Sequence, residues 1–229
     1  MNDVKTQTET KEPQYQCCID LARRQGTTRF GLMTNYMWHN DPRHLAFLLS
    51  RYKFVAKMLS GRGHVLEVGC ADAFGTRVVL QEVKRLTAVD FDPVFVQDVQ
   101  GRMDERWKFE CLVHDMIEKP LPGPFDAAYA MDVIEHIPLD QEERFVGNIA
   151  KSLMDHGVLI LGSPSLQSQA YASEASKQGH VNCKDQRGLK ELLGHFFHNI
   201  FVFSMNDEVV HTGYSPMAQY LIGLACDKK

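Results

Sequence analysis

The chain has 229 residues, of which 44% are hydrophobic and 24% are charged, and its net charge is −4. This is the composition of a globular protein with room for one α/β domain, and the lack of a basic cluster disfavours a polynucleotide substrate. The polar N-terminus has no apolar signal-peptide core, and no run of about eighteen apolar residues predicts a membrane span. We therefore expect a cytoplasmic protein that binds neither nucleic acid nor membrane and keeps its six cysteines reduced.

Two segments precede the first expected strand. Residues 1–13 are polar and threonine-rich and are predicted to be a disordered tail, and residues 14–63 are predicted to form an N-terminal helical segment. Within it, Asp41 as N-cap and Pro42 at the first helical position predict a helix start. The residues of one face of that helix are apolar, and Gly61 and Gly63 should end it. The apolar positions are Leu45, Leu48, Leu49, Tyr52, Val55, Ala56 and Leu59.

From residue 64 onward, short apolar runs alternate with helical patterns. Strands are expected at Val65–Gly69, Leu86–Phe91, Phe109–Val113, Phe125–Met131, Val158–Leu161, Ile200–Met205 and Tyr220–Cys226. Helices are expected at Phe74–Glu82, Pro93–Met103, from Asp140 until Gly157 ends the helix, and at Asp185–Leu193. Residues 64–229 are therefore predicted to form one α/β domain around a doubly wound, mostly parallel, seven-stranded sheet. In such sheets, ligands bind beyond the carboxyl ends of the strands.

Residues that suit an adenosine ligand follow the first two strands. The first strand leads into a turn at Gly69, kept open by the small residues Ala71 and Ala73. The second strand ends at Asp90, whose carboxylate can accept both hydroxyl hydrogens of a ribose. Simple packing of strand against helix would also explain the turn alone, and Asp92 before Pro93 suits a helix cap better than Asp90 does. The turn and the acid together favour a nucleoside-containing cofactor.

Five motifs in the same order and spacing resemble those of class I S-adenosylmethionine-dependent methyltransferases of the small-molecule group. The resemblance covers about residues 42–226 and implies the Rossmann-like fold and S-adenosylmethionine as cofactor. The family usually has glycines where this chain has Ala71 and Ala73, which should leave the loop slightly less open. The motifs are Val65-Leu-Glu-Val-Gly-Cys-Ala-Asp-Ala73, Ala88-Val-Asp-Phe-Asp92, Val113-His-Asp-Met116, Phe125-Asp-Ala-Ala-Tyr-Ala-Met-Asp-Val-Ile-Glu-His136 and Gly157-Val-Leu-Ile-Leu-Gly-Ser-Pro164.

The resemblance also implies roles for individual cofactor-binding residues. It implies that Glu67 and Gly69, with Cys70 and Ala71 in the same loop, hold the amino-acid end of the cofactor. Asp90 would bind the ribose and Phe91 would pack on the adenine. The remaining implied contacts are Asp115 with Met116 at the adenine amino group, and Met131 with Asp132 at the methyl-donor pocket.

Methyl transfer to a hydroxyl group or to a protonated nitrogen needs a proton acceptor, and histidine is the usual choice near neutral pH. His136, after the fourth strand, and His180, after a polar stretch, are the candidate catalytic residues. That stretch, at about residues 165–182, is predicted to form a lid, in which Tyr171 is a weaker candidate. His39 lies in an aromatic segment, Tyr36-Met-Trp-His39, for which packing on the core is the favoured interpretation.

The same histidines raise the question of a metal. His180, Cys183, His195 and His198 could be written as a four-ligand set, but their spacing is not that of structural zinc sites. His195 and His198 also fall near a predicted helix C-terminus, where histidine suits the helix dipole. We therefore expect no metal.

The sequence favours a methyltransferase that acts on a small molecule, with oxygen as the favoured acceptor atom, and a homodimer is compatible with it. Sugars, nucleotide-linked sugars, quinone precursors and small acids remain open as acceptors. An NAD-dependent oxidoreductase is the first alternative, which Ala71 and Asp115 disfavour because a pyrophosphate needs glycine at the Ala71 position. A non-catalytic binding module of the same fold is the second.

Overall fold

The computed structural model describes residues 9–229, which separate into two compact units at Phe30 and Gly31. The first unit contains the 3-10 helix η1 (Pro13–Tyr15) and helix α1 (Gln16–Gln25), and neither has a buried residue. Of the predicted disordered tail, residues 1–8 lie outside the described residues, and η1 begins at Pro13. The unit boundary falls inside the predicted 14–63 helical segment, so the later helices of that segment belong to the larger unit.

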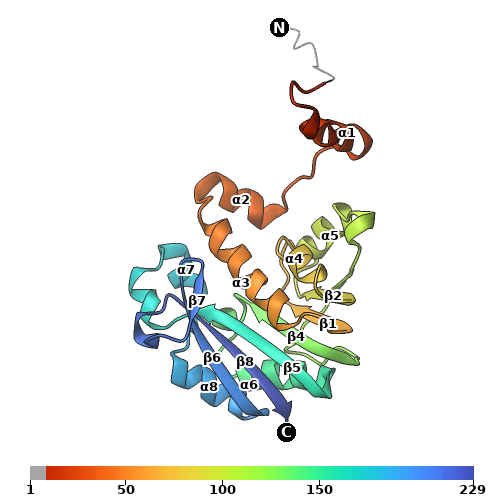
Figure 1. The fold of residues 1–229 in the computed structure, drawn as a ribbon. Coiled ribbons are helices and arrows are strands. Elements are labelled where there is room, and N and C mark those ends of the chain that lie inside the picture. The colour runs from red at the N-terminus through yellow and green to blue at the C-terminus, as the bar shows by residue number, and fades with distance from the viewer. Residues whose placement is uncertain (1–8) are drawn as a thin grey trace. The chain divides into compact units, whose positions relative to one another are not determined.

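An eight-stranded sheet organises the larger unit (Figure 1). Its order is β3-β2-β1-β4-β5-β8-β6-β7. Neighbours from β3 to β5 pair in parallel, whereas β8, β6 and β7 pair antiparallel. The strands are β1 (His64–Val68), β2 (Arg85–Asp90), β3 (Glu110–Val113), β4 (Phe125–Met131), β5 (Leu153–Pro164), β6 (Phe197–Asn206), β7 (Val209–His211) and β8 (Tyr220–Lys228).

The predicted doubly wound, mostly parallel α/β fold is confirmed, with one more strand than expected. The additional strand, β7, is three residues long and forms a hairpin with β6 through a turn at Asp207, whose φ is 49°. Three residues are too few to show a strand periodicity in the sequence.

Helix α6 ends earlier than predicted. It runs from Glu142 to Ser152, with Gln141 rather than Asp140 as N-cap, and β5 starts at the next residue. Gly157 therefore lies inside the strand and does not end the helix. This part of the strand was not predicted because the polar residues Asp155 and His156 interrupt its apolar run. The pairing of β5 with β4 also shifts register here.

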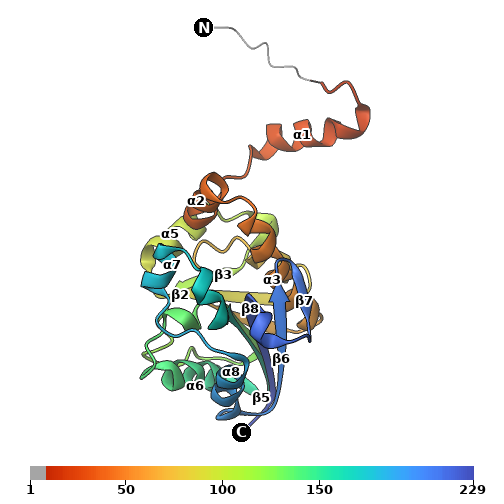
Figure 2. The same ribbon diagram turned by 90° about the vertical axis from the view of Figure 1, so that its left-hand side faces the viewer.

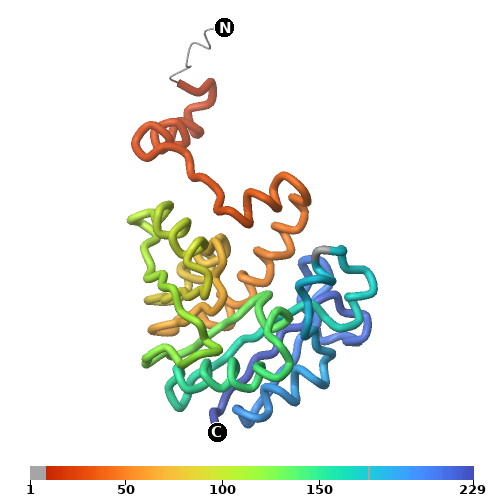
Figure 3. Tube along the Cα trace, turned by 180° about the vertical axis from the view of Figure 1, so that it is seen from behind, coloured from red at the N-terminus to blue at the C-terminus, as the bar shows by residue number. Residues whose placement is uncertain are grey.

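Helices cover both faces of the sheet. Successive side chains of a strand point to opposite faces, so an apolar strand has two apolar faces to bury. Val65 of β1 packs in a core with α3, α4 and α5, and the next residue, Leu66, packs in a second core with α6 and α8. Figure 2 shows α3 and α6 on opposite sides of the strands, and Figure 3 gives the reverse view. The helices of this unit are α2 (Leu32–Asn40), α3 (His44–Met58), α4 (Thr76–Leu80), α5 (Pro93–Gly101), α6 (Glu142–Ser152), α7 (Glu174–Gly179) and α8 (Gln186–Gly194), with 3-10 helices η2 (Glu105–Trp107), η3 (Ile134–His136), η4 (Gln167–Tyr171) and η5 (Ser215–Met217).

Within the larger unit, two helices precede β1, where one was predicted from Asp41 onward. Asp41 is the C-cap of α2, and α3 starts at His44, so the predicted start at Asp41 is wrong. Helix α2 was missed because it has no apolar face: its one buried residue is Thr34. Tyr36 and Trp38 are 69% and 52% exposed, which contradicts the expected packing of this aromatic segment on the core.

The strand order reverses between β1 and β4, which places the expected ligand site at their carboxyl ends. Within residues 9–229, no helix is both long and apolar enough to cross a bilayer.

Candidate active site

A cavity of about 720 Å³ lies at the carboxyl ends of the parallel strands. The residues that follow β1, β2, β3 and β4 line it, among them Gly69, Asp90, Asp115 and Asp132. Met33 of α2 also lines it. The topology therefore brings four segments that are distant in sequence to one cavity, as the strand-end rule predicts.

The loop after β1 has three residues in the left-handed backbone region: Gly69 (φ 72°), Ala71 (φ 45°) and Ala73 (φ 53°). A Cβ atom at Gly69 would lie 2.4 Å from Cγ2 of Val133, so glycine is required there for space as well as conformation. Alanine at a left-handed position costs about 1–2 kcal/mol. Alanine in place of the family's usual glycine therefore strains the backbone at positions 71 and 73. From the sequence we expected only a slightly less open loop.

Glu67 is placed differently from the role that the resemblance implied. It is buried and is not among the residues that line the cavity. Its two carboxyl oxygens accept hydrogen bonds from the hydroxyl groups of Tyr52 (3.0 Å) and Thr76 (2.6 Å). Burial raises the pKa of Glu67 to about 7. Its carboxyl group therefore links β1 to α3 and α4 under the loop, while Gly69, Cys70 and Ala71 face the cavity.

Asp90 and Phe91, at the end of β2, both line the cavity. The carboxylate of Asp90 is fixed by two backbone amides, since Ala71 N–H donates to Oδ2 (2.8 Å) and Asp92 N–H donates to Oδ1 (2.9 Å). Each oxygen keeps acceptor capacity for one further hydrogen bond, such as one from a ribose hydroxyl. Phe91 is 73% exposed and offers an unburied aromatic face beside it.

The residues after β3 form the next part of the wall. Asp115 lines the cavity, and its Oδ1 accepts a hydrogen bond from the Ile117 amide (2.7 Å), which fixes the carboxylate. Met116 also lines the cavity and is otherwise buried. Asp90, Phe91, Asp115 and Met116 therefore meet at one side of the cavity, where the resemblance implies an adenosine.

Met131 and Asp132, at the end of β4, line the cavity as expected, but the sequence did not reveal the partner of Asp132. Both carboxylate oxygens of Asp132 accept from Nη1 of Arg51, at 2.7 and 2.8 Å. The Arg51 guanidinium is buried and stacks 3.9 Å over the ring of Tyr220. Arg51 was missed because it lies on the predicted inner face of a helix, where only the apolar positions were counted.

Three groups that can act as metal ligands or bases converge at one part of the cavity wall: Glu135, His136 and His180. One ligand atom from each lies within 4.8 Å of the others. The rings of the two histidines meet edge to face, with centroids 5.2 Å apart. The candidate catalytic histidines therefore lie together, and Glu135, which the sequence analysis did not single out, joins them.

The environment of these groups affects their charge. Burial, and then the neighbouring carboxylate of Asp132, raise the pKa of Glu135 well above its usual value. Burial, and then the neighbouring His136, lower the pKa of His180, which favours the neutral ring. The site therefore presents an imidazole lone pair at His180 rather than a cationic ring.

Other candidates from the sequence lie away from the cavity. His39 is exposed on α2 and Tyr171 is 93% exposed, and neither is a lining residue. His195 is paired with Glu143 (3.1 Å), and His198 lies on β6. The four-ligand set weighed from the sequence is thus not the group that the described residues bring together.

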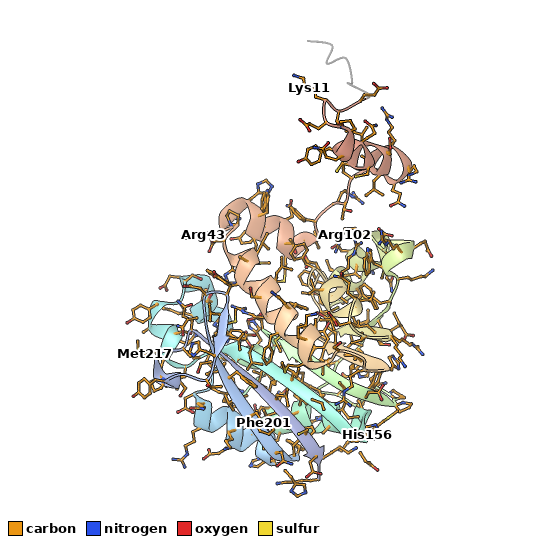
Figure 4. All side chains as sticks on the ribbon, in the orientation of Figure 1. Lys11, Arg43, Arg102, His156, Phe201 and Met217 are labelled. Carbon is orange, nitrogen blue, oxygen red and sulfur yellow. The ribbon has the colours of Figure 1, made fainter. Side chains whose placement is uncertain are left out.

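Helix α2 is attached to the loop after β1 by polar contacts. The Thr34 amide donates to Oδ2 of Asp72 (2.7 Å), and Gly31 leaves no room for a Cβ, which would lie 2.4 Å from that side chain. Arg102, labelled in Figure 4, donates from Nη2 to the Asp72 carbonyl oxygen (2.9 Å). These contacts fix the wall to which Met33 and Met37 contribute.

Comparison with known proteins agrees with this arrangement. Residues 65–157 match the family model of a methyltransferase domain. A probable S-adenosylmethionine-dependent methyltransferase of Mycobacterium tuberculosis is 31% identical over 102 residues, which is 44% of this chain and 35% of that protein. The ubiquinone biosynthesis O-methyltransferase of Xylella fastidiosa is 24% identical over 51% of this chain and 50% of its own length. The matched region thus spans a third to a half of these curated relatives.

A solved structure extends the likeness over most of the fold. The N-methyltransferase NodS of Bradyrhizobium japonicum, in complex with S-adenosyl-L-homocysteine, has a TM-score of 0.59 and 20% identity, covering 83% of this chain and 91% of NodS. The matched domain model includes the loop after β1, Asp90, Asp115 and Asp132. Residues 65–157 therefore match a methyltransferase domain, and the fold is that of class I S-adenosylmethionine-dependent methyltransferases.

Proposed function

We propose that this chain transfers the methyl group of S-adenosylmethionine to an oxygen atom of a small-molecule acceptor. The observation that carries the proposal is the placement of Asp90, Asp115 and the Gly69 loop around one cavity. Two fixed carboxylates at successive strand ends suit the ribose hydroxyls and the adenine amino group. The loop suits the amino-acid end of the cofactor.

In this proposal, the adenosine lies along the ends of β2 and β3. The ribose hydroxyls donate to Asp90, the adenine stacks on Phe91, and the adenine amino group donates to Asp115. Met116 closes the adenine pocket from within the core. The methionine portion then passes Gly69, Cys70 and Ala71, and its sulfonium lies near Met131 and Asp132.

The transfer itself is an in-line displacement. The acceptor oxygen forms a bond to the methyl carbon as the carbon–sulfur bond breaks, which releases S-adenosylhomocysteine and a proton. The protein mainly positions the acceptor and excludes water, because the sulfonium is already a good leaving group. His136 and His180 lie on the cavity wall as the groups that deal with the acceptor proton.

An oxygen acceptor is favoured by this pair of histidines. A neutral amine already has a lone pair and needs no base to attack a methyl sulfonium, whereas an alcohol or phenol must lose a proton. The relatives include both an N- and an O-methyltransferase, so their names do not decide the matter. The imidazole groups at the cavity are what supports oxygen here.

The experiment is to incubate the purified chain with methyl-labelled S-adenosylmethionine and matched panels of hydroxyl and amine acceptors. We expect label in ethers or esters, with S-adenosylhomocysteine formed in equal amount. Methylated amines alone would contradict an oxygen acceptor. Tighter binding of NADH than of S-adenosylmethionine would instead support the oxidoreductase alternative, and cofactor binding without turnover on a broad panel would support a non-catalytic module.

A further inference from the structure

Glu135 occupies an unusual place for a carboxyl group. It lies in the 3-10 helix η3 directly after β4, is 1% exposed, and still lines the cavity. Among the described residues, nothing donates a hydrogen bond to its Oε2 atom. A buried polar atom without a partner costs about 1–3 kcal/mol, so such an atom at a cavity indicates a ligand.

His136 and His180 are both oriented by an acceptor on the same ring nitrogen. Nδ1 of His136 lies 2.9 Å from the carbonyl oxygen of Gly179, and Nδ1 of His180 lies 2.9 Å from Oε1 of Gln169. The Gln169 amide is itself oriented, since its Nε2 donates to the Ser165 carbonyl oxygen (3.3 Å). An acceptor pairs only with a protonated Nδ1, so the Nε2 atom of each neutral ring carries a lone pair.

Histidines that bind metals in proteins are held in this way. The remote ring nitrogen donates to a carbonyl or amide oxygen, which fixes the tautomer and turns the other nitrogen toward the ion. Here the two rings and the carboxyl group of Glu135 each bring one potential ligand atom within 4.8 Å of the others. Groups of these three kinds at one place are the ligands that a cation would hold together.

We propose that Glu135, His136 and His180 bind a divalent first-row transition-metal ion through one carboxylate oxygen and two imidazole nitrogens. Two histidines and one carboxylate form a common ligand set for such ions, whereas Mg²⁺ and Ca²⁺ prefer oxygen ligands alone. Among the described residues, the group of ligand atoms includes no fourth side chain, and the carboxylate of Asp132 is paired with Arg51 instead. The ion therefore keeps open coordination positions toward the cavity.

This inference rests on the proposed function for its chemical purpose. An ion with open positions at the acceptor side would polarise the O–H bond of a hydroxyl acceptor and lower the pKa of that hydroxyl. The proton leaves to solvent, the oxygen bonds to the methyl carbon, and the sulfonium leaves as the neutral thioether. This inference changes the role that the proposed function gives His136 and His180: they hold the ion and do not take the proton themselves. An alcohol or phenol remains the favoured acceptor, because its hydroxyl is the group that the ion would acidify.

The test is a calorimetric titration of chelator-stripped protein with Co²⁺, followed in parallel by visible absorption, which reports nitrogen and oxygen coordination. Exposed thiols are a competing site, so every titration uses a Cys17→Ser, Cys18→Ser background. We expect one ion per chain. Glu135→Gln and His180→Ala should each weaken binding at least tenfold.

Two further variants separate a ligand site from a folding effect. Gln169→Ala touches no ligand atom but removes the acceptor that orients His180, and should weaken Co²⁺ binding about tenfold. His198→Ala, an exposed histidine on β6, should leave it unchanged. Equal affinity in the wild type and His180→Ala, or no binding in the wild type, would overturn the site, and thermal unfolding of each variant confirms that it is folded.

Chelation distinguishes failure of this inference from failure of the proposed function. If methyl transfer persists at full rate with a strong chelator while S-adenosylmethionine binds, the metal role is wrong and the proposed function stands. If Co²⁺ binds with the expected variant effects but S-adenosylmethionine does not bind, the metal site stands and the proposed function is wrong.

Discussion

The buried carboxyl group of Glu67 predicts a specific pH dependence of stability. Burial raises its pKa to about 7, from an ordinary value of 4.5. Between these values the folded chain holds a proton that the unfolded chain has released. The contribution of Glu67 is therefore fully present below pH 4.5 and is lost as the pH rises through 7. At about 1.4 kcal/mol per pH unit, the gap between 4.5 and 7 amounts to roughly 3 to 4 kcal/mol.

Urea unfolding at a series of pH values from about 5 to 8 measures this effect in the wild type and in Glu67→Gln. Glutamine has a similar shape and no charge, so the variant should lose roughly 2–3 kcal/mol less stability than the wild type across this range. Glu118→Gln, at an exposed position, is the matched control and should follow the wild type. Parallel pH profiles for the wild type and Glu67→Gln would refute the assignment of a raised pKa to this residue.

Three further predictions follow from the site geometry. Ala71→Gly should raise the free energy of unfolding by up to about 1 kcal/mol, because glycine relieves the left-handed strain. A lower free energy of unfolding for this variant, measured by denaturant titration, would contradict the prediction. Arg51→Met should cost about 3 kcal/mol in the same assay by leaving Asp132 without its partner, and adding Asp132→Asn should recover part of the loss; a purely additive double variant would argue against the pair. Phe91→Ala should weaken S-adenosylmethionine binding about tenfold in calorimetry without lowering stability, because this ring is exposed; unchanged affinity would remove it from the adenine site.

The parallel half of the sheet was predictable from the sequence because its strands are short, apolar and followed by polar residues. Asp90 and Asp115 could be assigned to one edge of the sheet from their positions after successive strands, since the carboxyl ends of parallel strands share that edge. Elements without a clear period were not predictable. Helix α2 buries a single residue, and β7 has only three residues.

The acceptor side was only partly predictable. His136 and His180 were identified separately, but their meeting with Glu135 depends on how the segment after β5 returns to the end of β4. The amides of Val181 and Asn182 donate to the Glu135 carbonyl oxygen (2.8 and 3.0 Å), a pairing with no sequence signature. From the sequence we expected no metal, whereas from the structure we propose a three-ligand site.

Glu67, under the loop after β1, shows a second limit of prediction from the sequence. The motif indicated Glu67 as a cofactor contact because it precedes Gly69, but strand alternation turns it into the core with Tyr52 and Thr76. Motif position alone cannot separate a residue that touches the ligand from one that supports the loop. Burial and hydrogen-bond partners decide between the two roles.

The cofactor assignment is tested most directly by calorimetric titration of the wild type, Asp90→Ala and Asp92→Ala with S-adenosylmethionine. Asp92 is a matched acid two residues away that caps α5 and does not line the cavity. We predict one S-adenosylmethionine per wild-type chain, binding at least tenfold weaker to Asp90→Ala, and near-wild-type affinity in Asp92→Ala. No binding by the folded wild type at high micromolar cofactor, or equal affinity in Asp90→Ala, would contradict the assignment of this cavity to S-adenosylmethionine.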